Sequence, residues 1–131
     1  MPEENKQYQA RKGFVMNKQD VMTNSEIQTV KDIILETVDC EKIYLFGSFA
    51  NGTSQKDSDF DFYVVLKNEN LNPVFAEQSI YRSLSKREGH YKPVDVLAEN
   101  INNFNALCFL PTIERKIARE GILLYDISGI D

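Results

Sequence analysis

The sequence is poor in the residues that build disulfide bridges and zinc sites. It has 2 cysteines and 1 histidine in 131 residues. Cys40 and Cys108 lie far apart and show no C-x-x-C spacing, so we expect two reduced cytosolic thiols rather than a disulfide or a zinc site. His90 stands alone after Gly89. An exposed loop histidine is favoured over a catalytic one, because a catalytic histidine needs an orienting partner.

Long apolar runs and excess positive charge are lacking as well. The apolar runs are short, such as ILLY at 122–125, and the N-terminal MPEENKQYQARK has no apolar signal segment. Neither a membrane span nor a secretory signal is therefore predicted, and we expect a cytoplasmic protein. The formal net charge of −5 argues against a broad surface for long nucleic acids. A single nucleotide that brings its own metal ion is compatible with that charge.

The length and composition predict one folded domain. A chain of 131 residues with 42% hydrophobic and 11% aromatic residues can bury a core. Residues 1–22 are polar and lack sustained periodicity, so they are predicted to form a mobile N-terminal arm. The domain is then expected to span residues 23–131, and no internal repeat or linker divides it.

The spacing of apolar residues predicts alternating helices and strands. Ser25 and Gln28 have the spacing of a capping box, and a helix is predicted over 25–38 because apolar residues recur on one helical face. Gly121 is interpreted as the glycine that follows a helix. The other predicted elements are strands at 43–46, 59–66 and 94–97, a helix at 73–87, helical turns near 104–108, a helix from Pro111, and an edge strand at 122–125.

Three aspartates are the strongest candidates for chemistry. Asp59 and Asp61 are two apart on one predicted strand and leave the same face, while Phe60 and Phe62 point into the core. If the strand that carries Asp95 lies alongside, its carboxylate faces the same pocket. Carboxylates so close repel unless a cation lies between them, and Mg²⁺ prefers oxygen ligands. A divalent metal site is therefore predicted.

A Gly-Ser pair ends the strand that precedes these acids. Gly47 allows close backbone approach to a ligand, and Ser48 with the following turn can present a hydroxyl and N–H groups to phosphate oxygens. A phosphate cradle beside metal-binding acids is typical of phosphoryl or nucleotidyl transfer. No G-K-[ST] occurs, so the cradle is not a Walker loop.

These residues together resemble a known motif. Gly47-Ser48, ten intervening residues and then Asp59-Phe60-Asp61 are similar to the GSx10DxD motif of the DNA polymerase β-type nucleotidyltransferase superfamily. Gly52 and Ser58 in between, and Asp95 in the later PVDVL, agree with that motif. The superfamily members closest in size are the minimal nucleotidyltransferases (MNT), many of which are antitoxins paired with HEPN-domain toxins. The resemblance covers about residues 25–125.

The resemblance implies a fold, a reaction and a partner. The expected fold is α/β (α+β), a small mixed β-sheet flanked by helices. The expected reaction is transfer of NMP, by analogy AMP from ATP, to a hydroxyl of a partner protein such as a HEPN-type toxin. The implied catalytic and metal-binding residues, holding two Mg²⁺ ions, are Asp59, Asp61 and Asp95, with Asp95 taking the proton. The implied binding residues for ATP or another NTP are Gly47, Ser48 and Ser58.

The chain departs from many relatives in the loop after Gly-Ser. Where they carry arginines, Phe49 and Asn51 stand here, so cationic help for the triphosphate is expected from Lys56 or from the partner. Two alternative functions stay open: transfer of a nucleotide to a small molecule such as an antibiotic, and a catalytically silent binding module.

Two further points concern individual residues, and a third concerns assembly. Tyr63 either packs under a helix or stacks on a base. The cations Arg115, Lys116 and Arg119 are expected to form a solvated helix face. The oligomeric state stays open.

Overall fold

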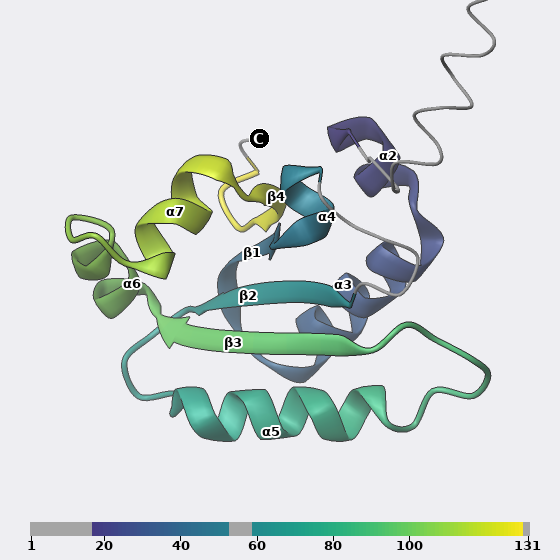
Figure 1. Cartoon of the computed structure of the whole chain (residues 1–131). Coiled ribbons are helices and arrows are strands. Elements are labelled where there is room, and N and C mark those ends of the chain that lie inside the picture. Colours follow the sequence, from purple (N-terminus) through teal and green to yellow (C-terminus); the bar gives the residue numbers. More distant parts are fainter. Residues whose placement is uncertain (1–16, 53–58, 130–131) are drawn as a thin grey trace, which may run out of the picture.

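A mixed β-sheet forms the centre of the protein (Figure 1). The computed structural model describes residues 17–52 and 59–129. Within them a four-stranded sheet has the order β3-β2-β1-β4. The strands are β1 (Cys40–Phe46), β2 (Phe60–Leu66), β3 (Val94–Asn100) and β4 (Ile122–Asp126). β1 is antiparallel to both β2 and β4, whereas β2 and β3 are parallel. The predicted mixed sheet, with its edge strand at the C-terminal end, is confirmed.

Helices cover both faces of the sheet (Figure 1). They are α2 (Lys18–Thr23), α3 (Ser25–Thr37), α4 (Ser48–Asn51), α5 (Pro73–Leu84), α6 (Ile101–Leu107) and α7 (Ile113–Glu120). On one face α3 and α5 pack over Phe60 and Phe62, as predicted for these two phenylalanines. On the other face α6 and α7 bury a smaller aromatic cluster that includes Tyr63 and Phe104. Asp61 of β2 belongs to this second face.

Part of the predicted N-terminal arm packs on the domain. Helix α2 begins after Asn17, whose side chain accepts a hydrogen bond from the Asp20 N–H at 2.8 Å. Val21 in this helix is 0% exposed and belongs to the main core. Residues 17–22 therefore contribute to the fold, because burial of an apolar side chain holds them in place. The rest of the predicted arm, 1–16, lies outside the described residues.

The predicted capping box at the start of α3 is wrong by one residue. Asn24 is the N-cap, and its side-chain oxygen accepts from the Ile27 N–H at 2.9 Å. The Gln28 side chain instead donates to the Val21 carbonyl at 3.3 Å. Asparagine caps helices as well as serine does, and the end of α2 places Asn24 in the extended conformation that a cap requires.

Helix α5 starts where the sequence predicts and secures the outer edge of β3. The Asn72 side chain accepts from the Val74 and Phe75 N–H groups, and proline follows at the first helical turn. From this helix the Tyr81 hydroxyl accepts from the Val96 N–H at 2.7 Å, and a Glu77 carboxylate oxygen accepts from the Ala98 N–H at 2.9 Å. These bonds cover an exposed strand edge and hold the strand that carries the third aspartate. The helix ends at Leu84, earlier than the predicted 87.

Helix α7 differs from its prediction at both ends. It is capped by Thr112, which accepts from the Arg115 N–H at 3.1 Å, so Pro111 lies before the helix and does not begin it. Gly121 has φ −71°, which is extended rather than left-handed. The small residue is needed there for space, because a Cβ would lie 2.7 Å from the Ile117 carbonyl oxygen.

The remaining sequence-based expectations concern the cysteines, the single histidine and the membrane. Cys40 and Cys108 are both free thiols, and burial is the main reason that the pKa of Cys40 rises to about 12. His90 is exposed in the loop after Gly89. Within the described residues, no helix combines the length and the apolar character needed to cross a bilayer.

Candidate active site

Strand register places three side chains in one row across the second face of the sheet. Phe46 at the end of β1 pairs with Asp61 on β2, and Asp61 pairs in turn with Asp95 on β3. Side chains of directly paired residues lie on the same face, a few ångströms apart. The row runs from the Phe46 ring to the carboxylates of Asp61 and Asp95, and these two acids are called the acid row below. It confirms the sequence-based expectation that Asp95 lies beside Asp61.

The two paired carboxyl groups interact directly. The pKa of Asp61 is raised from its ordinary value of 3.8 to about 6. Burial is the largest cause, followed by the charges of Asp95 and Asp59 and by a side-chain hydrogen bond with Asp95. The pair is therefore short of positive charge, and either a proton or a cation stabilises it.

Asp59 lies just before β2, half-buried, and is close enough for its charge to act on Asp61. Among the described residues, however, no group of three or more His, Cys, Asp or Glu side chains is gathered tightly enough to hold a metal ion. The structure thus brings Asp61 and Asp95 together, with Asp59 near but not joined to them. Two carboxylates still suit Mg²⁺, which usually takes one or two of them and completes its shell with water and phosphate.

Gly47 is in contact with the same acids. Its φ of +77° lies in the left-handed region that glycine adopts readily. A Cβ at this position would lie 3.1 Å from the Asp61 Cγ, and closer still to its Oδ2. The Gly-Ser bend and the carboxylate therefore occupy adjacent space, as the sequence predicted for a phosphate cradle beside the acids.

The residues after Gly47 form the short helix α4. Ser48 is its first residue, and the Gly47 carbonyl accepts from the N–H groups of Ala50 and Asn51. Phe49 is 1% exposed and packs against Phe60, with ring centroids 4.7 Å apart. The Phe49 that departs from the family pattern is thus a core residue that anchors the bend. The predicted contributions of Ser58 and Lys56 lie outside the described residues.

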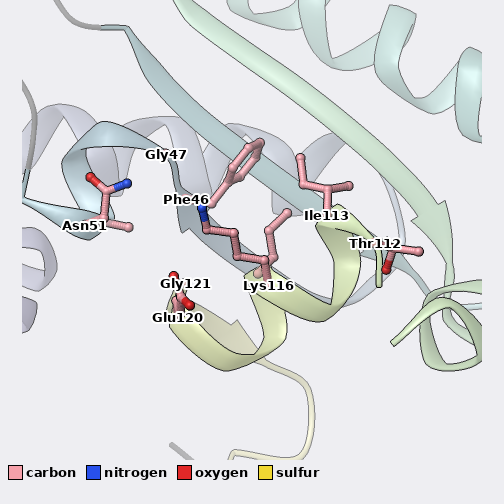
Figure 2. A pocket seen from close by; sticks show the side chains of 10 residues that line it. Phe46, Gly47, Asn51, Thr112, Ile113, Lys116, Glu120 and Gly121 are labelled. Atoms are coloured by element: carbon pink, nitrogen blue, oxygen red, sulfur yellow. The ribbon is translucent and has the colours of Figure 1, made fainter. Parts of the chain in front are cut away.

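A pocket opens between the Gly-Ser bend and helix α7 (Figure 2). Its volume is about 460 Å³. The lining residues are Phe46, Gly47, Ala50, Asn51, Thr112, Ile113, Lys116, Ile117, Glu120 and Gly121. Lys116, expected only on a solvated helix face, lines this pocket, and its nitrogen points toward Phe46 and Gly47. Helical periodicity could have shown that Lys116 and Ile113 share a face, but not that this face is turned toward Gly47.

Tyr63 packs under the helices, so of the two roles considered for it, packing under a helix or stacking on a base, the first is the one observed. It is 1% exposed, contacts the Phe46 and Phe104 rings, and donates through its hydroxyl to a Glu114 carboxylate oxygen at 2.8 Å. Burial and, after it, this hydrogen bond raise the pKa of the Tyr63 hydroxyl. The residue holds α7 over the sheet and so shapes the pocket.

The fold is supported by one of the solved structures that are similar to this chain. A putative nucleotidyltransferase from Sulfolobus solfataricus is 21% identical, with a TM-score of 0.51, over 83% of this chain and 90% of that one. A toxin-antitoxin solved with AMP-PNP is 20% identical, TM-score 0.47, over 76% and 72% of the two chains. A mutant of the toxin-antitoxin MntA-HpeT is 17% identical, TM-score 0.46, over 85% and 74%. No curated protein sequence matches significantly.

The sheet order and the acid pair beside a Gly-Ser bend define a domain of the nucleotidyltransferase class. The family described as polymerase beta, nucleotidyltransferase, matches residues 28–129. That match spans more than half of the chain, so the protein belongs to this family. The resemblance drawn from GSx10DxD and Asp95 is thereby confirmed.

Proposed function

We propose that this protein is a Mg²⁺-dependent nucleotidyltransferase that transfers AMP from ATP to a hydroxyl group of a partner protein. Membership of the nucleotidyltransferase family supports the reaction class. The observation that carries the proposal is the Asp61 and Asp95 pair on adjacent strands, with Gly47 against Asp61. A silent relic would have no need to keep two repelling carboxylates together beside an open bend.

The metal ions would be held by the three aspartates. Asp61 and Asp95 form the observed pair, and we propose that Asp59 joins them when metal and nucleotide bind. The ions supply electrostatic stabilisation of the phosphates and of the departing pyrophosphate. The raised pKa of Asp61 supports this assignment, because a cation would relieve the same repulsion that now favours a proton.

The chain's own groups would orient the reactants and accept a proton. The oxygen of the acceptor hydroxyl bonds to the α-phosphorus, the bond from that phosphorus to the bridging oxygen breaks, and pyrophosphate leaves. Asp95 is exposed at the edge of the acid row and would take the hydroxyl proton. Gly47, Ser48 and Ser58 would hold the triphosphate.

A protein acceptor is supported by the resemblance to minimal nucleotidyltransferases and by the surface near the pocket. In the loop between α6 and α7, Phe109 is 85% exposed and Leu110 is 54% exposed. Adjacent exposed apolar side chains are typical of surfaces that meet another macromolecule. A toxin of the HEPN type, encoded next to this protein, is the proposed acceptor, and the cytoplasm is the proposed location.

The test is incubation of the protein with Mg²⁺, ATP and the protein encoded beside it, followed by intact-mass measurement. The expected result is a partner that gains AMP units. Asp61→Asn and Asp95→Asn are each expected to abolish this mass gain, because each removes the negative charge of a proposed metal-binding carboxylate. Asp32→Asn is the matched control and is expected to keep full activity, since this aspartate is exposed on α3, which packs on the opposite face of the sheet.

The two alternatives give different masses. A stable complex whose partner gains no mass would overturn the enzymatic proposal in favour of a silent binding module. Consumption of ATP with a free aminoglycoside or lincosamide, and an unmodified partner, would instead identify a small-molecule transferase.

A further inference from the structure

The pocket beside α7 joins two chemically different surfaces. Phe46 and Ile117 form an apolar floor on the sheet and the helix, and Ile113 extends it toward the open side. Near Gly47 the surface changes, because the Lys116 ammonium group reaches this end of the pocket (Figure 2). One end thus suits a flat apolar group and the other an anion.

The lysine is available to a ligand. Within residues 17–52 and 59–129, no carboxylate lies within ion-pair distance of the Lys116 nitrogen, although Glu120 lines the same pocket. An ammonium group on a flexible stem pairs readily with phosphate oxygens. The chain has a net negative charge and lacks arginines in the loop after Gly-Ser. Lys116 therefore supplies a positive charge where the phosphates of a bound nucleotide would require one.

The position of the acid pair indicates how a bound nucleotide would be oriented in the pocket. Phe46 is the cross-strand neighbour of Asp61, so the pocket floor continues directly from the acid row. A nucleotide whose phosphates face Gly47 and Asp61 would have its base and ribose over Phe46. The cavity of about 460 Å³ lies within the range of small-molecule sites.

We propose that this pocket binds the base and ribose of the nucleotide, against Phe46 and Ile113, and that Lys116 contacts its phosphates. This inference rests on the proposed nucleotidyl transfer and specifies where the nucleoside end of the substrate binds. Lys116 takes the role that loop arginines have in many relatives. Ile113 supplies apolar contact to the base alone.

Two probes separate the two ends of the pocket. Binding of AMP-PNP with Mg²⁺ is measured by calorimetry beside binding of inorganic tripolyphosphate with Mg²⁺, which has no base or ribose. Ile113→Asn is expected to weaken AMP-PNP binding about 10-fold, a loss of about 1.4 kcal/mol, and to leave tripolyphosphate binding unchanged. Lys116→Gln is expected to weaken both ligands about 5- to 10-fold.

Matched variants control for charge and folding. Arg119→Gln removes one positive charge from the same helix outside the pocket, and both affinities are expected to stay within about 2-fold of the native values. Ile113→Ala keeps an apolar side chain and is expected to weaken AMP-PNP about 3-fold, between native and Asn. Ile113 is 46% exposed, so thermal unfolding of either variant should match the native protein.

Each outcome is decisive. Native-like AMP-PNP affinity in both Ile113→Asn and Lys116→Gln would overturn the pocket assignment and leave the proposed function standing. Equal loss of both ligands in Ile113→Asn would place phosphates, not the base, against this residue and would also overturn it. Failure of the native protein to bind AMP-PNP with Mg²⁺ would overturn the proposed function, and this inference with it.

Discussion

Gly47 and Asp61 occupy neighbouring space so tightly that residue 47 has no room for a side chain. A Cβ there would lie 3.1 Å from the Asp61 Cγ, and the backbone has a positive φ of 77°. The bend that would hold phosphates and the carboxylate that would hold a metal are therefore one structural unit. A change at either residue affects the other.

Gly47→Ala is expected to reduce both nucleotide binding and the free energy of unfolding. The backbone at Gly47, with φ +77° and ψ −152°, is one that almost only glycine adopts, so a side chain there costs about 1–3 kcal/mol, and contact with the Asp61 carboxylate adds about 1–2 kcal/mol. Chemical denaturation of the variant is the measurement. Gly129→Ala is the matched control, since Gly129 has a similar φ of +78° but no atom within 4 Å of its added Cβ. It is expected to lose only the backbone contribution.

The origin of the extra cost can be checked in a second background. In an Asp61→Ala protein the colliding carboxylate is gone, so Gly47→Ala should cost about 1–2 kcal/mol less than it does in the native background and keep only the backbone contribution. An unchanged penalty in that background would contradict a contact between residues 47 and 61.

Asp61→Asn is expected to stabilise the metal-free protein above pH 6. The pKa of Asp61 is raised to about 6, so the folded protein binds this proton more tightly than the unfolded chain. The group's contribution to stability is therefore complete below about pH 4 and is lost as pH rises through about 6. After allowance for screening by solvent, the variant should exceed the native protein by about 1 kcal/mol at pH 7.5.

The measurement is urea unfolding of both proteins in chelator, from pH 4 to 8. The difference between them should be near zero at pH 4 and grow through pH 6. Added Mg²⁺ should raise the melting temperature of the native protein more than that of the variant, because the variant lacks one anionic ligand. A difference that is constant across this pH range would contradict the raised pKa.

Tyr63→Phe is expected to lower stability without a direct effect on nucleotide binding. The variant loses the hydrogen bond from the Tyr63 hydroxyl to Glu114, which costs about 1–2 kcal/mol. A double-mutant cycle with Glu114→Gln measures the coupling between the two side chains. If Tyr63→Phe left stability unchanged and weakened AMP-PNP binding, the residue would belong to the ligand site instead of the support of α7.

Asn24→Ala is expected to destabilise the protein more than Ser25→Ala. Asn24 caps α3 through the Ile27 N–H, and loss of such a cap costs about 1 kcal/mol. Ser25 is exposed within the first turn and should tolerate alanine within about 0.5 kcal/mol. Thermal unfolding of the two variants compares them directly, and the reverse order would restore the capping box expected from the sequence.

The shared face of the first two aspartates could be anticipated from local pattern alone. Alternation of polar and apolar residues places Asp59 and Asp61 on one face of a strand with Phe60 and Phe62 on the other, whatever the rest of the chain does. Asp95 required one further assumption, that its strand lies beside theirs, and the parallel register of β2 and β3 confirms it.

The pocket could not be anticipated in this way. Lys116 and Ile113 lie far along the chain from Gly47, and their spacing shows only that they share a helix face. Whether that face meets solvent or the Gly-Ser bend depends on how α7 is seated, and the Tyr63 hydrogen bond to Glu114 helps to seat it. Helical periodicity therefore predicts a solvated cation at Lys116 and misses its place in the pocket.

The amino-acid sequence by itself determined the alternation of elements, the motif and the nucleotidyltransferase family, because each depends on residues close together in the chain or at a set spacing. Tertiary structure alone decided that Gly47 abuts Asp61, that Asp61 and Asp95 interact, and that α7 turns Lys116 toward the Gly-Ser bend. Such contacts arise from strand pairing and helix packing between distant segments, which local periodicity does not encode.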